Sequence, residues 1–265
     1  MSVTNADLVV VASANMPEDD VSLSGGVVDL AVKMTFTDID VADTVNIVSD
    51  NANDDIVLRV FGKDASGADV TEDLTLSSGT ATTPDAGAQT FLTIDKVVKQ
   101  SGTRAAGATV TLYRTSAGDP LATFEAASVS PTDTEITTVR KIFYDATSGA
   151  AQKLLYEKVF YHNNNATFTL SDANIQIEAF TPPGSLTFAV GLSATLDDSA
   201  SVAQRLDTAP GGVSFVAPGV DVAVANSQNH SPGSDQGVWI RITIPLSHAA
   251  VQSSTFTLVE AGGTL

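Results

Sequence analysis

Apolar and polar residues alternate along most of this chain, and that period of two constrains its fold more than any other feature. Val32, Met34 and Phe36 alternate with polar residues, as do the apolar residues of segments 73–77 and 109–112. Successive side chains of a strand point to opposite faces, so these segments are predicted to be strands with one buried face. The expected strands recur about every 8–12 residues, the spacing typical of an antiparallel sandwich. The sequence therefore predicts an all-β fold.

Clusters of Gly, Asp, Asn and Ser separate the expected strands and favour turns between them. Beyond the segments above, the strands we expect are residues 8–14, 44–49, 56–62, 69–77, 91–99, 121–126, 136–144, 153–161, 167–170, 174–179, 186–190, 213–216, 238–244 and 255–259. Residues 63–69 are predicted to form the loop of a hairpin. Residues 153–159 also fit one or two helical turns, but the Val, Phe and Tyr that follow directly favour a strand.

The alternation lapses only in residues 125–135, which read EAASVSPTDTE and contain a proline. A proline disfavours helix in the residue before it, and a polar stretch without periodicity is typical of a linker. We therefore expect a domain boundary near 126–136. The predicted fold is two antiparallel β-sandwich domains in tandem, Ig-like or jelly-roll-like. The first domain is residues 1–130 and is acidic, and the second is residues 131–265.

The charge balance excludes several classes of partner. The chain carries 31 Asp and Glu against 13 Lys and Arg, a formal net charge of −18. Nucleic-acid binding needs a basic face, so we expect no nucleic-acid partner. No apolar run reaches the roughly 20 residues of a membrane span, and we expect no membrane partner. The apolar stretch 8–14 lacks a basic segment before it, so we expect no signal peptide.

The sequence contains no recognised catalytic motif. It contains no cysteine, which removes disulfides, thiolate nucleophiles and Cys-ligated metals. His162, His230 and His248 lie in or beside polar loops without a recognised nucleophile motif, and we predict them to be surface residues. Aromatic residues make up only 6% of the chain, too few for the sugar platforms of a typical glycosidase. We therefore expect no enzymatic activity.

The acidic loops make calcium the cofactor to consider. Residues 50–55 (DNANDD) offer oxygen ligands, and Asp38, Asp40 and Asp43 precede them. The loop lacks the central Gly and the terminal Glu of an EF-hand. Acidic residues also have a structural reason to occupy turns between strands. We therefore predict no metal and no cofactor.

The uneven charge distribution suggests where the chain meets neighbours. Residues 1–58 carry a net charge of −10, with eleven acids and one base, whereas residues 208–265 carry −2, with three acids and one base. We expect the first region to face water and the last to lie against other subunits.

Within the last region, Trp239 and Arg241 share one face of a predicted strand, and Trp and Arg are enriched at interface centres. They are the predicted interface anchors, although the second sheet of a sandwich could equally cover that face. Arg140 and Lys141 are the predicted polar rim of the interface.

Three stretches of the second half follow one another in a recognisable order. They are residues 140–149 (RKIFYDATSG), residues 207–215 (DTAPGGVSF), and residues 237–245 (GVWIRITIP) with 255–262 (TFTLVEAG). In order and spacing they resemble a strand with an N-T-S-G turn, a T-A-P-x-G-V-x-F segment and the closing strands of a group of tailed-bacteriophage virion structural proteins. The resemblance covers about residues 136–265 and implies a β-sandwich virion component, without enzymatic activity, made in the cytoplasm of the bacterial host.

The hypothesis that follows is a capsid decoration (cement) protein. Decoration proteins bind the lattice of the major capsid protein, and most form trimers, so the resemblance implies a trimer and two partners, the major capsid protein and copies of the chain itself. A tail, neck or baseplate component built from the same modules is the alternative within virions. A calcium-dependent or carbohydrate-binding adhesion module is the alternative from another class, since it would also combine acidic loops with a sandwich.

Overall fold

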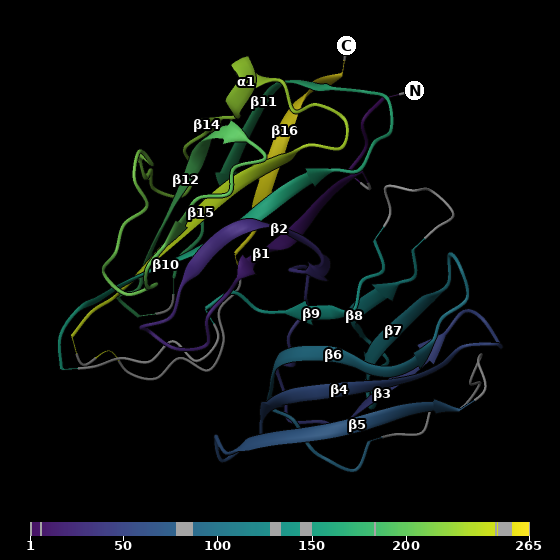
Figure 1. Cartoon of the computed structure of the whole chain (residues 1–265). Helices are drawn as coiled ribbons and strands as arrows, with labels where there is room; N and C mark the ends of the chain where they lie inside the picture. The colour runs from purple at the N-terminus through teal and green to yellow at the C-terminus, as the bar shows by residue number, and fades with distance from the viewer. Residues whose placement is uncertain are drawn as a thin grey trace. The chain divides into compact units, whose positions relative to one another are not determined.

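The computed structural model describes residues 2–5, 7–77, 87–127, 134–143, 150–182, 184–246, 248 and 256–264. It has an all-β fold made mainly of antiparallel strands (Figure 1), as the alternation predicts. The strands are β1 (Leu8–Asn15), β2 (Ser24–Lys33), β3 (Val45–Ser49), β4 (Asp55–Lys63), β5 (Asp69–Ser77), β6 (Thr93–Thr103), β7 (Thr109–Arg114), β8 (Pro120–Glu125), β9 (Thr138–Arg140), β10 (Lys153–Asn163), β11 (Leu170–Ile177), β12 (Thr187–Leu196), β13 (Ser201–Val202), β14 (Val222–Ala223), β15 (Asp235–Ile244) and β16 (Leu258–Thr264).

The chain divides into two compact units, but not into the predicted tandem domains. Unit 1 consists of Met1–Asp29 together with Ile142–Leu265, and unit 2 consists of Leu30–Lys141. Unit 2 is therefore an insertion in the sequence of unit 1. The predicted domains, 1–130 and 131–265, are therefore wrong. They lack the boundary after Asp29 and place the other one before Lys141.

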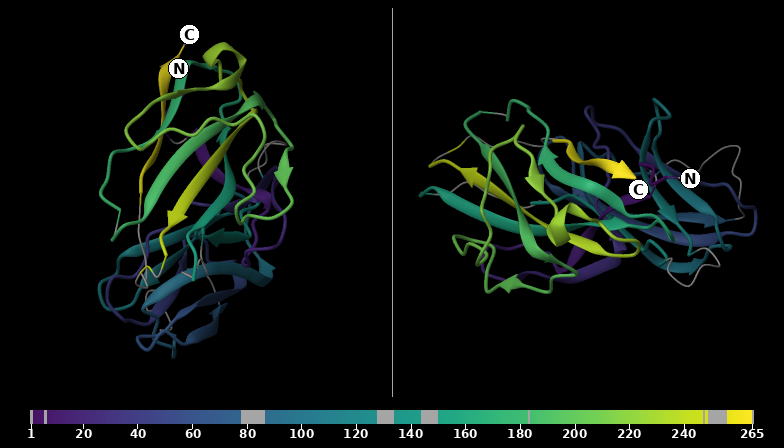
Figure 2. Two further views of the ribbon diagram at one scale, coloured as in Figure 1. Left: turned by 90° about the vertical axis from the view of Figure 1, so that its left-hand side faces the viewer. Right: turned by 90° about the horizontal axis from the view of Figure 1, so that it is seen from above.

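Strand pairing explains the difference. The strand β1, purple in Figures 1 and 2, runs antiparallel to β10 with Val9 opposite His162, so the N-terminal strand lies in the sheet of the second half. At the other end, β9 pairs with β6 with Val139 opposite Val97, so the chain stays in unit 2 after the polar stretch 126–136. A lapse in local alternation does not reveal such long-range pairing, because it reports only on neighbours in sequence.

Unit 1 contains two sheets. The larger runs in the order β12-β15-β10-β1-β2, with β13 beside the start of β2, and the smaller in the order β14-β11-β16. Tyr161 of β10 donates a hydrogen bond of 2.6 Å from its hydroxyl to the carbonyl of Leu258 in β16, which ties the two sheets together. Every residue of β10 from Leu155 onward is buried, so this central strand is covered on both faces.

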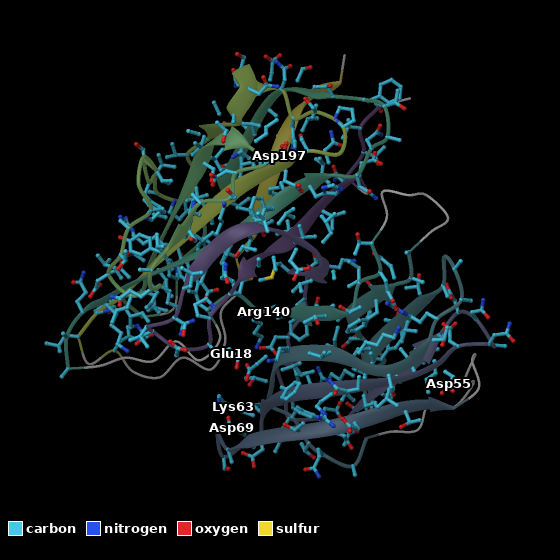
Figure 3. All side chains as sticks on the ribbon, viewed as in Figure 1. Glu18, Asp55, Lys63, Asp69, Arg140 and Asp197 are labelled. Carbon is cyan, nitrogen blue, oxygen red and sulfur yellow. The ribbon has the colours of Figure 1, made fainter. Side chains whose placement is uncertain are left out.

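Unit 2 has a second pair of sheets around its own core. One is β9-β6-β4-β5, joined in parallel by the end of β2, and the other is β3-β7-β8. The β4–β5 hairpin has the loop that the sequence predicts, with Gly67 at a φ of +83°. Lys63 and Asp69 flank this loop (Figure 3), with 2.6 Å between Lys63 Nζ and Asp69 Oδ1. The core between the sheets consists of Ile39, Val45, Ile47, Ile56, Leu58, Val60, Leu74, Leu76, Phe91, Ile94, Val97, Val110, Leu112, Leu121, Ala122, Phe124, Ile136 and Val139.

Helix is nearly absent from the described residues. The single helical segment there is α1 (Ala225–Gln228), whose Asn226 and Ser227 both have a φ of 56°. No helix among the described residues is long and apolar enough to cross a membrane.

Candidate functional site

Trp239 is a core residue of unit 1 and not an exposed anchor. Only 1% of its surface is accessible, and it packs with Tyr156 and Val202. A Cβ added to Gly25 would lie 2.7 Å from the Trp239 ring, so the backbone of β2 approaches the indole directly. The prediction that Trp239 anchors an interface is therefore wrong. The segment around Val202 packs over Trp239. It therefore covers the face of β15 that lies opposite the apolar face of this strand.

A buried lysine lies beside this tryptophan. Lys158 is fully buried, its Nζ lies 2.7 Å from a carboxylate oxygen of Asp198, and it also donates to the carbonyls of Gly26 and Ala200. Burial lowers the pKa of Lys158, and the contact with Asp198 only partly offsets that effect. Burial tends to raise the pKa of Asp198, but hydrogen bonds from Lys158 and Ser193 outweigh it and lower that pKa. The pair holds the covering segment on the sheet.

Arg241 lies on the same face of β15 as Trp239 but is only partly buried. In the sheet register it stands between Tyr156 of β10 and Ala189 of β12. Its guanidinium carbon lies 5.2 Å from the centroid of the Phe215 ring, a cation–π distance. Its Nε is buried without a hydrogen-bond partner. Of the four predicted interface residues, Arg241 alone therefore combines partial exposure with an unused hydrogen-bonding group.

Arg140 and Lys141 do not form an exposed basic rim. Arg140, labelled in Figure 3, is 6% exposed and donates from Nε to the carbonyl of Lys141 over 3.2 Å. The Nζ of Lys141 forms an ion pair with Asp38 and lies 3.9 Å from Asp95. Both residues belong to unit 2, whereas Trp239 and Arg241 belong to unit 1. The four residues therefore do not form one cluster within either unit.

The acidic loop 50–55 uses its carboxylates for the fold. Asp54 is 1% exposed and accepts hydrogen bonds from the Ser49 hydroxyl at 2.5 Å and the Ala105 N–H at 2.7 Å. Asp50 accepts one from the N–H of Thr109 at 2.9 Å. Across the described ranges, no three His, Asp or Glu side chains come together as a metal site would require.

The buried ionic groups of unit 1 are the feature that sequence reasoning missed. Glu157 and Arg205 are both fully buried, with 2.8 Å between Glu157 Oε1 and Arg205 Nη1. His230 is fully buried and His162 is 8% exposed, so the prediction that they are surface residues is wrong. The signal was available in the run LLYEKVFYHN, where charged letters interrupt a strand too apolar to have a solvent face. Buried charges of this kind need partners, which the sequence alone does not identify.

Unit 2 contains a shallow hollow of about 250 Å³ beside the end of β6, lined among others by Lys99, Arg104 and Glu135. Glu135 accepts hydrogen bonds from both cations, at 2.6 Å from Lys99 and 2.8 Å from Arg104. Burial tends to raise the pKa of Glu135, but the two cations outweigh it and lower that pKa. Among the described residues, the hollow therefore brings together an ion-pair network around Glu135.

Comparisons with known proteins leave the family open. No protein-family model matches the chain, and no curated protein matches it. A structure of the infectious bursal disease virus Gx strain aligns over 100% of this chain and 68% of the viral chain, with 10% sequence identity and a TM-score of 0.15. A score that low supports no statement about the fold or the function of this chain.

Proposed function

We propose that this protein is a non-enzymatic structural component of a tailed-bacteriophage virion, and specifically a capsid decoration (cement) protein. Its proposed partners are the lattice of the major capsid protein and other copies of the chain. The protein would be made in the cytoplasm of the bacterial host and incorporated into the head. Its role would be to stabilise the shell by adding contacts between shell subunits.

The observation that carries this proposal is that two of the stretches resembling phage virion proteins pack on each other. Val213 and Phe215, from stretch 207–215, pack with the cluster around Tyr156 and Trp239, the latter from stretch 237–245. The Phe215 ring also meets Tyr156 edge to face, with 5.5 Å between the ring centroids. Residues from two of the three stretches thus pack together in one cluster of unit 1, while residues 144–149 of the remaining stretch lie outside the described residues. This supports a shared structural module over a chance match of letters.

The disposition of charge in unit 1 fits a structural role as well. Unit 1 has only four Lys and Arg residues, and Lys158 and Arg205 are both fully buried. Lys153 is paired with Asp20 over 2.6 Å. With two of its four cations buried and a third paired with a carboxylate, unit 1 has a mainly acidic exterior, which disfavours binding to polyanions such as nucleic acid.

Immunogold electron microscopy tests the proposal. An antibody raised against the purified protein is applied to intact phage particles from the strain that encodes the chain. Regular label over the heads is the expected result. Label confined to tails, necks or baseplates overturns the decoration role in favour of the alternative virion role. Particles without label, combined with protein recovered only in particle-free fractions, overturn the virion assignment altogether. Antibody against an established shell protein serves as the positive control.

A further inference from the structure

Arg241 is the one cation of unit 1 without an anionic partner in the described part of the chain. Lys153, Lys158 and Arg205 each have a carboxylate oxygen within 2.8 Å. In the described part of the chain, Arg241 forms no ion pair and no hydrogen bond through its side chain, and its contact with the Phe215 ring is the only specific interaction found there. In a chain with 31 acids and 13 bases, a cation without a carboxylate stands out.

The surroundings of Arg241 hold its guanidinium in place. Phe215 covers one side of the group at 5.2 Å, and Tyr156 supports Phe215 edge to face at 5.5 Å. Leu154 and Val213 are partly buried apolar residues that pack with the same cluster. An Arg stacked on an aromatic ring loses less side-chain entropy when it binds a carboxylate, because the planar group is already oriented.

The nitrogens of Arg241 determine what can bind. Nε is the nitrogen that is buried without a partner, which leaves Nη1 and Nη2 as the pair that reaches solvent. Two adjacent N–H donors of a guanidinium match the two oxygens of a carboxylate. Leu154, Val213 and Phe215 pack on the cluster that contains Tyr156, the residue opposite Arg241, and this apolar rim favours a carboxylate that is presented beside an apolar side chain.

The same unit displays a segment with that chemistry. Asp221 is exposed and makes no hydrogen bond or ion pair through its side chain in the described part, and Val220 before it is 46% exposed, one of the few large apolar side chains on the surface. The N–H of Gly219 donates to the Ile177 carbonyl over 2.7 Å, which fixes the base of this segment. Val220 and Asp221 thus form a firmly held tip that combines an apolar side chain with a free carboxylate.

We propose that Arg241, stacked on Phe215, receives Asp221 of a second copy of this chain, with Val220 of that copy on the apolar rim. The two residues belong to different patches of unit 1, so the contact joins copies either twice about a two-fold axis or from copy to copy around a rotation axis. The inference rests on the self-association that the proposed function includes. It does not depend on the location in the virion, which the immunogold experiment tests separately.

Charge exchange between the two residues tests the pairing. Sedimentation velocity of the purified full chain, over a range of concentrations and at low and high salt, measures self-association. We expect Arg241→Asp and Asp221→Arg each to weaken association about tenfold or more, as loss of a central Arg contact typically does. The variant that carries both changes restores the opposite charges and should associate like the wild type. Glu178→Arg is the matched control, since Glu178 is another exposed acid of unit 1 without a side-chain partner in the described part.

Each outcome decides the proposal. Circular dichroism and thermal melting of all variants confirm that a change in association is not a loss of fold. Weakened association in both single variants, rescue in the double variant and an unchanged control support the pairing. A wild type that stays monomeric up to its solubility limit overturns it, as does association that survives both single changes. Loss in both single variants without rescue overturns the Arg241–Asp221 pairing, even though decoration of heads could still be observed.

Discussion

His230 and Glu260 face each other inside unit 1, with 2.6 Å between ring Nδ1 and carboxylate Oε1 and neither side chain exposed to solvent. The other ring nitrogen, Nε2, lies 3.0 Å from the carbonyl oxygen of Ser234. Both nitrogens therefore face acceptors, an arrangement that suits an imidazolium with two N–H donors. Glu260 lies in β16 and His230 precedes β15, so the pair fastens the last strand of the chain to the body of unit 1.

The first prediction concerns pH. Burial tends to lower the pKa of His230, but the hydrogen bond and charge of Glu260, the Ser234 carbonyl and the charge of Asp235 outweigh it and raise that pKa. Tyr161, from β10, also feels the charge of Glu260, and its own pKa is raised by burial and by that charge. A raised folded-state pKa gives stability that is complete below the unfolded value, about 6.5, and is lost as pH rises through the folded value. We expect the free energy of unfolding to fall as pH rises above about 6.5.

Urea denaturation at a series of pH values measures this dependence. The double variant His230→Gln with Glu260→Gln removes both charges and keeps polar groups in place. Its free energy of unfolding should therefore lack the part of the decline with rising pH that the pair contributes. Glu260→Gln alone should lose it too, because the imidazolium then has no counter-charge. A double variant with the same slope as the wild type between neutral and mildly alkaline pH would contradict the assignment to this pair.

The second prediction concerns the buried pair Arg205 and Glu157. Arg205 donates from Nη1 to Glu157 Oε1 at 2.8 Å and to the carbonyl of Pro17 at 3.0 Å. Removal of one member of a buried pair leaves an uncompensated charge and costs about 3–5 kcal/mol. We expect Arg205→Met to destabilise the fold by about that much. Adding Glu157→Gln should recover part of the loss, since the amide oxygen can still accept the N–H of Phe143, as Glu157 Oε2 does at 3.0 Å.

Arg59 provides the matched control for Arg205. It makes a two-pronged contact with Asp73 at 2.7 Å, but both side chains are more than a third exposed. Exposed ion pairs contribute little because water and salt screen them. Denaturant unfolding should therefore show little change for Arg59→Met. Equal losses for Arg205→Met and Arg59→Met would refute the claim that burial makes the difference.

Features that depend on residues close together in the sequence were predictable, and features that depend on distant contacts were not. The β4–β5 hairpin was predictable because Asp64, Ser66 and Gly67 supply turn chemistry within a few residues. The start of β2 was missed because Gly25 and Gly26, both with positive φ, interrupt the alternation there. Segments 167–170 and 174–179 were predicted as two strands, but β11 is one strand with an irregular register between Ser171 and Asn174.

The candidate site was harder to predict, for a physical reason. Alternation identified Trp239 and Arg241 as residues on one face of a strand, and that is correct. It could not say that the loop bearing Asp198 and Val202 folds over Trp239 and stops short of Arg241, because that depends on contacts distant in sequence. The unit boundary at Asp29 was unpredictable in the same way, since a continuous strand passes through it.

The third prediction tests the buried position of Trp239. Trp239→Ala should destabilise unit 1 by about 3–5 kcal/mol, the usual cost of removing a core aromatic side chain. Gly25→Ala should also destabilise, because Gly25 has a φ of +93° and an added Cβ would lie 2.7 Å from the indole and 2.9 Å from the Ala200 carbonyl. Gly67→Ala is the control, with a similar φ of +83° but no atom within 4 Å of the added Cβ. Thermal melting should rank Gly25→Ala well below Gly67→Ala. Similar melting temperatures for both would contradict the close packing of Trp239 on β2.

The last prediction separates a structural role of the acidic loop from calcium binding. Asp54 Oδ2 accepts from the Ser49 hydroxyl and Oδ1 from the Ala105 N–H, so Asp54→Ala leaves one buried and one part-buried donor without their acceptor. Such a loss typically costs about 1–3 kcal/mol. We expect this destabilisation to be the same with calcium and with chelator. Asp55→Ala should have little effect, since Asp55 is exposed. A ligand that binds only the folded state raises its stability. A wild-type melting temperature that rises with calcium, and an Asp54→Ala variant that loses the rise, would therefore show that the loop binds the metal and would favour the adhesion alternative.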